Sequence, residues 1–147
     1  MLEDDQDIPT IREGIKSLCE KFPEKYWRET DRSRSYPKEF VKALSDHGYL
    51  GCLIPEKYGG SGQKLRAAAV ILEEIHRSGG NGAACHAQMY IMGTLLRHGS
   101  EVQKQKYLPG IAEEVCGFRL LELLSREVEP IRFLLRPRRE KMVKNSL

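Results

Sequence analysis

The sequence predicts an all-α protein, an antiparallel bundle of about five helices followed by a basic C-terminal tail. Three observations predict this fold class. Apolar residues recur at steps of three and four through most of residues 8–115, which is the period of a helix face. Prolines and glycines separate these runs at the points where loops are needed. The chain has 147 residues, 40% hydrophobic and 31% charged, which suits one domain with a modest core.

The first predicted helix covers residues 8–22, and Pro23 then ends it. Four apolar residues lie on its inner face at steps of four, three and four. They are Ile11, Ile15, Leu18 and Phe22. Residues 24–35 are crowded with charge, and we expect a turn or a short irregular helix there. Tyr26 and Trp27 are expected to pack beneath it.

The second helix is predicted over residues 37–47, with Pro37 at its first position and Gly48 as a left-handed C-terminal cap. The segment IPEKYGGSG at residues 54–62 is predicted to be a loop with several positive-φ glycines. It lacks the Gly-Lys-Ser/Thr ending of a P-loop and does not match GxGxxG. We therefore expect a tight connector and not a phosphate site.

Three further helices follow. The first covers residues 64–77, where small alanines would allow a neighbouring helix to approach closely. A glycine-rich hinge at 78–82 leads to an unusually apolar helix at 83–98, which we expect to be buried on several sides. Its methionines and alanines also suit the wall of an apolar ligand pocket. A capping box at 100–103 opens a last, short helix that Pro109 is expected to end.

Composition excludes several function classes. No apolar run approaches the roughly 20 residues that span a bilayer, so no membrane association is expected. The acidic start resembles neither a secretory signal nor a transit peptide, and a cytoplasmic protein is the default expectation. The cysteines stand singly, which disfavours a zinc site and favours burial as small apolar residues. They are Cys19, Cys52, Cys85 and Cys116.

Charge is unevenly distributed along the chain. Residues 116–147 carry eight basic and four acidic side chains, whereas residues 1–115 are close to neutral. A basic tail can bind nucleic acid or an acidic surface. The run at 136–139 is the only feature that favours nucleic acid, and no aromatic residues alternate with it, so no nucleic-acid partner is expected.

Residues 8–115 resemble the N-terminal helical domain of the acyl-CoA dehydrogenase family. The matching segments appear in the family's order and spacing. They are YPKEFVKALSDHGYLG at 36–51, IPEKYGGSG at 54–62, VILEEIHRSGGNGAACHAQMY at 70–90 and LLRHGSEVQKQKYLPGIA at 95–112. The resemblance implies an enzyme that uses FAD to remove a proton and a hydride from the α and β carbons of an acyl-CoA thioester. It also implies an electron-transfer flavoprotein as partner and a homo-oligomer, usually a tetramer.

By this resemblance the N-terminal helices line the far end of the acyl pocket, while the flavin site and the catalytic glutamate lie in later domains. No catalytic residue and no metal ligand is therefore expected in this chain. The candidate pocket-wall residues are Gly82, His86, Met89 and Tyr90. His86 and Tyr90 would limit chain length or contact a substituent, or His86 would instead satisfy a buried hydrogen bond. Tyr58 is a weaker candidate, with a role as loop anchor as its alternative.

The resemblance stops near Cys116. The family continues with a flavin-binding segment of the form FGVTEP, whereas this chain reads FRLLELLSREVEPI at 118–131. Permitted codons for those residues, together with the first two nucleotides of the Arg132 codon, give SAFGVTEPGGGADT when they are read two nucleotides later. A frameshift near Cys116 would explain both the changed composition and the missing segment. The alternative is an authentic C-terminus, in which case the chain is a non-catalytic interaction module or a partial subunit.

Overall fold

The computed structural model describes residues 7–113. Within that range it contains six α-helices and two short 3₁₀ turns, and no strand. The α-helices are α1 (Asp7–Glu20), α2 (Glu24–Arg32), α3 (Lys38–Asp46), α4 (Leu65–Arg77), α5 (Ala83–His98) and α6 (Glu101–Glu113). The 3₁₀ turns are η2 (Tyr49–Gly51) and η3 (Glu56–Tyr58). The predicted all-α fold class is confirmed. The predicted basic tail at 116–147 lies outside the described residues.

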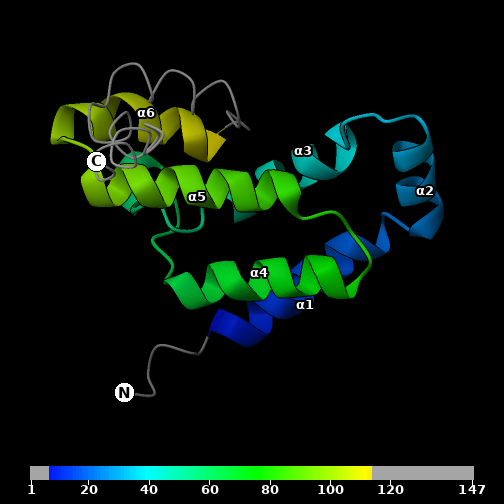
Figure 1. Cartoon of the computed structure of the whole chain (residues 1–147). Helices are drawn as coiled ribbons and strands as arrows, with labels where there is room; N and C mark the ends of the chain where they lie inside the picture. Colours follow the sequence, from blue (N-terminus) through cyan, green and yellow to red (C-terminus); the bar gives the residue numbers. More distant parts are fainter. Residues whose placement is uncertain (1–6, 114–147) are drawn as a thin grey trace, which may run out of the picture.

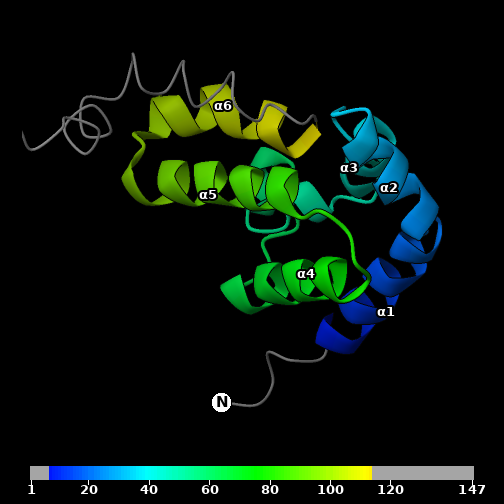
Figure 2. The same ribbon diagram turned by 45° about the vertical axis from the view of Figure 1, so that its right-hand side comes forward.

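Figure 1 shows α4, α5 and α6 as three neighbouring rods that reverse direction at each short loop. Helix α1 lies against α4, and η2 and η3 lie against α6, with η2 also contacting α5. Figure 2 shows α2 and α3 at one end of the molecule, next to the loop that joins α4 to α5. This arrangement brings two loops that are about 45 residues apart in sequence to the same end of the bundle.

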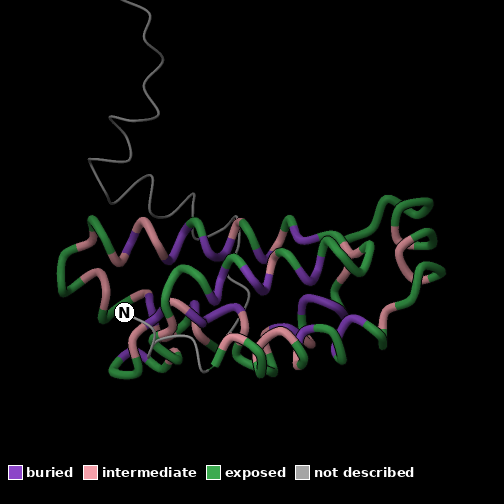
Figure 3. Tube along the Cα trace, turned by 90° about the horizontal axis from the view of Figure 1, so that it is seen from below, coloured by how far each residue is buried: buried purple, intermediate pink, exposed green. Residues whose placement is uncertain are grey.

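The core lies between the inward faces of these helices, and Figure 3 shows buried and exposed positions alternating along the chain, except in α2, which has only intermediate and exposed positions. Its largest fully buried apolar side chains come from every long element except α2. They are Ile15, Phe40, Leu44, Leu50, Ile54, Ile71, Ile75, Met92, Leu108 and Ile111. Each such burial stabilises the fold by about 1.5–3 kcal/mol before the cost of chain ordering.

Helix α2 is the main addition to the predicted element list. The sequence indicated a turn or a short irregular helix, because the segment has few apolar residues. In the structure it is a regular nine-residue helix with no fully buried residue. Its half-buried rings hold it in place: Trp27 packs edge-on against Phe40 at 4.8 Å between ring centroids, and Tyr26 against Phe22 at 5.1 Å. The expectation that Tyr26 and Trp27 serve as packing is confirmed.

Helix α6 is longer than predicted. Pro109 lacks an N–H group and was expected to end the helix, yet α6 continues to Glu113. The last turn is held by tertiary contacts instead: Leu108 and Ile111 are fully buried, and the Gln88 amide of α5 donates a 2.9 Å hydrogen bond to the Ile111 carbonyl. Packing thus replaces the backbone hydrogen bond that proline removes.

Two adjacent carboxylates on α4 hold α1 against α4 through an ion pair. Glu74 is 5% exposed, and the Arg12 guanidinium contacts both Glu74 and Glu73, the latter at 2.9 Å. This ion pair lowers the pKa of Glu73, mainly through the hydrogen bond from Arg12. The two carboxylates therefore make inter-helix contacts. They have no catalytic arrangement.

Candidate functional site

The loop between α4 and α5 sets the position of the site that the sequence indicated. Gly79 has φ +78°, a conformation that favours glycine, and ends α4. The Asn81 side-chain oxygen then accepts a 2.9 Å hydrogen bond from the N–H of Ala83, which fixes the start of α5. The first turn of α5 is consequently held against the last turn of α4.

Gly82 lies where these two helices meet. A Cβ at this position would be 2.9 Å from Nε2 of His76 and 3.4 Å from Cδ2 of Leu72. The glycine is buried, so α5 begins in direct contact with side chains of α4. A larger residue here would push the helices apart.

The remaining predicted residues divide between the two sides of α5. Met89 is buried among core side chains, at 7% exposure. His86 is exposed, and Tyr90 is 64% exposed. Because the steps from Gly82 to His86 and on to Tyr90 are each four residues, these three lie in one row along α5. The alternative of a buried hydrogen bond for His86 is not supported, since its side chain is on the surface.

Helix α4, whose His76 and Leu72 lie against Gly82, also has exposed side chains. Leu65 is 75% exposed, and Ala69 and His76 are exposed as well. The described region therefore carries a surface on α4 and α5 that mixes apolar groups with two imidazoles and a phenol. We call this surface the α4–α5 face, defined by Leu65, Ala69, His76, His86 and Tyr90.

Tyr58 lies elsewhere, in η3. Its side chain is 6% exposed, and its hydroxyl donates a 2.8 Å hydrogen bond to Glu101 at the start of α6. This hydrogen bond, followed by the one from Lys104, lowers the pKa of the Glu101 carboxyl. These contacts show Tyr58 attaching the glycine loop to α6.

The glycine loop at 54–62 is a tight connector, as the sequence predicted. Gly48, which precedes it, and Gly59 and Gly62 within it have φ values of +74°, +87° and +62°. The backbone N–H groups of Gly59, Gly60 and Gly62 all donate to carbonyls of the same loop. Since these donors are already used, the loop offers no cradle for the phosphates of FAD.

Thiol and metal chemistry find no support in residues 7–113. Cys52 and Cys85 are buried, and burial raises the pKa of each thiol to about 12, which keeps both protonated. Among the described residues, no three His, Cys, Asp or Glu side chains are grouped so as to hold a metal ion. In the same part of the chain, no helix is long and apolar enough to cross a membrane.

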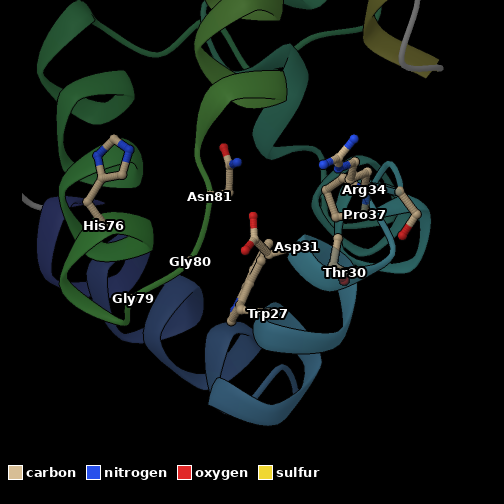
Figure 4. Close-up of a pocket in the computed structure, with 10 residues that line it drawn as sticks. Trp27, Thr30, Asp31, Arg34, Pro37, His76, Gly79, Gly80 and Asn81 are labelled. Atoms are coloured by element: carbon tan, nitrogen blue, oxygen red, sulfur yellow. The ribbon is translucent and has the colours of Figure 1, made fainter.

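The structure also contains a hollow that the sequence did not indicate. It has a volume of about 670 Å³ and lies between the α2–α3 connection and the α4–α5 loop (Figure 4). Ten residues line it: Trp27, Thr30, Asp31, Arg34, Ser35, Pro37, His76, Gly79, Gly80 and Asn81. Its two walls, formed by residues 27–37 and 76–81, are far apart in the sequence, so no local pattern could have placed them together.

Comparison with known proteins assigns the family. The model of the acyl-CoA dehydrogenase N-terminal domain matches residues 5–114. The chain is 34% identical to a 3-(aryl)acrylate reductase of Clostridium sporogenes, over 76% of this chain and 31% of the relative. It is 30% identical to a glutaryl-CoA dehydrogenase of Desulfococcus multivorans, over 80% of this chain and 32% of the relative. It is 39% identical to the mitochondrial isovaleryl-CoA dehydrogenase of Pongo abelii, over 67% of this chain and 24% of the relative.

The chain thus spans between a quarter and a third of the length of these relatives. No solved structure matched it. The helical fold, the order of the sequence segments and the match over residues 5–114 agree with one another. This chain belongs to the acyl-CoA dehydrogenase family, and residues 5–114 correspond to its N-terminal domain.

Proposed function

We propose that this chain contributes the acyl-pocket helices of a FAD-dependent acyl-CoA dehydrogenase and does not catalyse the reaction by itself. The observation that carries the proposal is the α4–α5 face, an open surface on the first turns of α5 that bears exposed His86 and Tyr90. Its apolar and hydrogen-bonding groups suit the end of an acyl chain more than they suit bulk water.

The contribution of the chain to the reaction would be to bind and shape the substrate. Tyr90 and Leu65 offer apolar surface to an acyl group, and the His86 imidazole offers a hydrogen bond at its end. Gly82 would keep the entrance between α4 and α5 narrow, and Met89 would support the wall from within the core. Tyr58 would act only indirectly, by fixing the glycine loop to α6.

The glycine loop does not fit the phosphates of FAD, because the N–H donors of Gly59, Gly60 and Gly62 are already used within the loop. FAD, an electron-transfer flavoprotein and a homo-oligomer are proposed on family grounds alone. A cytoplasmic location is proposed from the acidic start of the sequence. The relatives are three to four times as long as the matched segment.

We further propose that the tail arises from a shift of reading frame near Cys116. The observation that supports it is the family-like segment that residues 118–131 can encode two nucleotides later. The test is the nucleotide sequence across codons 105–147 and several hundred bases downstream. A frame encoding the TEP segment and a later glutamate-bearing domain would support the proposal, and the lack of such a frame would refute it.

Correcting the frame would also permit a test of the α4–α5 face. In the corrected protein, His86→Phe and Tyr90→Ala should change kcat/KM for acyl-CoA substrates of different length by different factors. Arg97→Gln, an exposed change farther along α5, serves as control. If each site variant changed kcat/KM by the same factor for every acyl-chain length, the α4–α5 face would not be part of the acyl pocket.

The second candidate function is a non-catalytic partial subunit. The exposed Leu65 and Tyr90 favour it, because an apolar surface of this kind would bind another protein domain as readily as a substrate. Co-expression with an intact relative, followed by size-exclusion chromatography, tests the idea. A chain that always elutes apart from the relative would count against it.

A further inference from the structure

Aromatic packing fixes the position of Trp27, which lines the hollow between α2 and the α4–α5 loop. The Trp27 ring is held edge-on between Phe40, at 4.8 Å between centroids, and Tyr26, at 5.2 Å. Gly80 lies directly on the indole, since a Cβ there would be 3.1 Å from Cζ2 of Trp27. The hollow is therefore present without any rearrangement, and its volume of about 670 Å³ is in the range of small-molecule sites.

Arg34 stands at an unusual backbone position on the rim. It is the only non-glycine residue of the described range with a positive φ, at +50°. The N–H of Arg34 donates to the Asp31 carbonyl and the N–H of Ser35 to the Thr30 carbonyl, each at 3.0 Å, which forms a helix-ending turn. Glycine or asparagine usually occupies this left-handed position. An arginine at this position therefore has a strained backbone, and its guanidinium lines the hollow.

Asp31 and Arg34 carry opposite charges but do not pair with each other. On a continuous helix, residues three apart are neighbours and form ion pairs. Because α2 ends at Arg32, the turn separates the two side chains, and neither has a salt-bridge partner within residues 7–113. Figure 4 shows the Asp31 carboxylate directed toward Asn81, with Arg34 on the far side of the open space.

Asn81 supplies a third polar group. Its side-chain oxygen already accepts the N–H of Ala83, so its amide nitrogen remains as the donor for a ligand. Among the residues that line the hollow, Asp31 thus supplies an anionic acceptor, and Arg34 and Asn81 supply donors, of which Arg34 is cationic. A simple anion would meet the Asp31 charge and a simple cation the Arg34 charge, so either alone is disfavoured.

We propose that this hollow binds a small zwitterion of the amino-acid type. The ammonium group lies at the Asp31 carboxylate, and the carboxylate group receives hydrogen bonds from Arg34 and Asn81. His76 borders both the hollow and the α4–α5 face, but the three ligand-binding side chains of the hollow, Asp31, Arg34 and Asn81, are not part of that face. The occupancy of the hollow therefore does not depend on the proposed enzymatic role.

Trp27 permits a direct test, because it is the only tryptophan in the chain and lines the hollow. The full 147-residue protein is titrated with L-alanine while tryptophan emission is recorded. N-acetyl-L-alanine, which lacks the cation, and L-alaninamide, which lacks the carboxylate, are titrated in parallel. We expect a saturable change with L-alanine and binding at least about tenfold weaker with either analogue, as the loss of one charged hydrogen bond predicts.

Arg34→Gly is the decisive variant. Glycine suits φ +50° better than arginine does, so the variant keeps its fold while losing the guanidinium. We expect it, and Asp31→Asn, to bind L-alanine at least about tenfold more weakly than the parent protein does. Arg97→Gln, on exposed surface of α5, should leave binding unchanged. An absent response to L-alanine, equal binding of either analogue, or full affinity in Arg34→Gly would overturn the proposal.

Discussion

Replacing Gly60 with alanine tests why the loop at 54–62 carries two adjacent glycines. A Cβ at Gly60 would lie 2.1 Å from the Ile54 carbonyl oxygen, 2.5 Å from the Ile54 Cβ and 2.6 Å from the Gly51 carbonyl oxygen. Two of these three atoms are backbone atoms, so no change of rotamer can relieve the overlap. The φ of Gly60 is not positive, so the requirement for glycine is one of space.

The magnitude follows from what must move. The loop is closed by hydrogen bonds from Gly62 N–H to the Ile54 carbonyl at 2.8 Å and from Gly60 N–H to the Pro55 carbonyl at 3.4 Å. Overpacking costs about 1–3 kcal/mol, and a lost hydrogen bond about 1 kcal/mol more. We therefore expect Gly60→Ala to lower the free energy of unfolding by about 3 kcal/mol. Urea unfolding of the 147-residue chain, followed by far-UV circular dichroism, measures this change.

Two other glycines provide matched controls. Gly48 has φ +74°, and a Cβ there would have no neighbour within 4 Å. Gly48→Ala therefore introduces backbone strain without a steric clash, and it should lower the free energy of unfolding by about 1 kcal/mol. Gly93 lies inside α5, also with open space, and Gly93→Ala should stabilise the protein by about 0.5–1 kcal/mol. The steric account is wrong if Gly60→Ala costs no more than Gly48→Ala.

Three further predictions concern a cap, two thiols and an ion pair. Ser100→Ala should cost about 1 kcal/mol in urea unfolding, because it removes the cap of α6; an unchanged midpoint would exclude a stabilising cap. Cys52 and Cys85, with pKa values of about 12, should react with a disulfide reagent at pH 8 only as fast as the protein unfolds, and rapid labelling of the native protein would contradict their burial. Arg12 lowers the pKa of Glu73, so their pair stabilises the fold above the ordinary glutamate pKa of 4.5, and this stability is lost as pH falls through the lower folded value. Arg12→Met should therefore weaken the dependence of the urea midpoint on pH in that acid range, and a variant with the parent slope would count against the assignment.

Local patterns predicted the elements whose own residues decide their structure. The capping box at 100–103 is present in full: the Ser100 N–H donates to the Gln103 side chain at 2.9 Å, and the Gln103 N–H donates to the Ser100 hydroxyl at 3.3 Å. Helix α5 was predicted with its observed bounds, because a glycine loop and a glycine cap flank an uninterrupted run. Such signals lie within a few residues of the boundary that they set.

Tertiary contacts decided the elements that were missed. Helix α2 has too few apolar residues for a clear period, and its rings hold it in place: Tyr26 packs against Phe22, just before the helix, and Trp27 packs against Phe40 on α3. Pro109 locally favours the end of the helix, but the burial of Leu108 and Ile111 stabilises the helical turn that follows it. The hollow could not be predicted either, since Asp31 on α2 and Asn81 in the α4–α5 loop line it together only through tertiary packing.

The candidate site shows the same division between local and distant causes. The spacing of His86 and Tyr90 places them in one row on any helix, but whether that row is buried depends on what lies opposite. The apolar composition of α5 predicted burial on several sides, whereas the described structure leaves Tyr90 64% exposed and Leu65 on α4 75% exposed. Covering two such side chains would be favourable by about 1.5–3 kcal/mol each. A surface that would gain this much from being covered supports the proposal that an acyl chain and the remaining domains of a longer enzyme lie against it. The proposed contacts involve groups outside residues 7–113, so neither helical periodicity nor the packing of this domain alone could predict them.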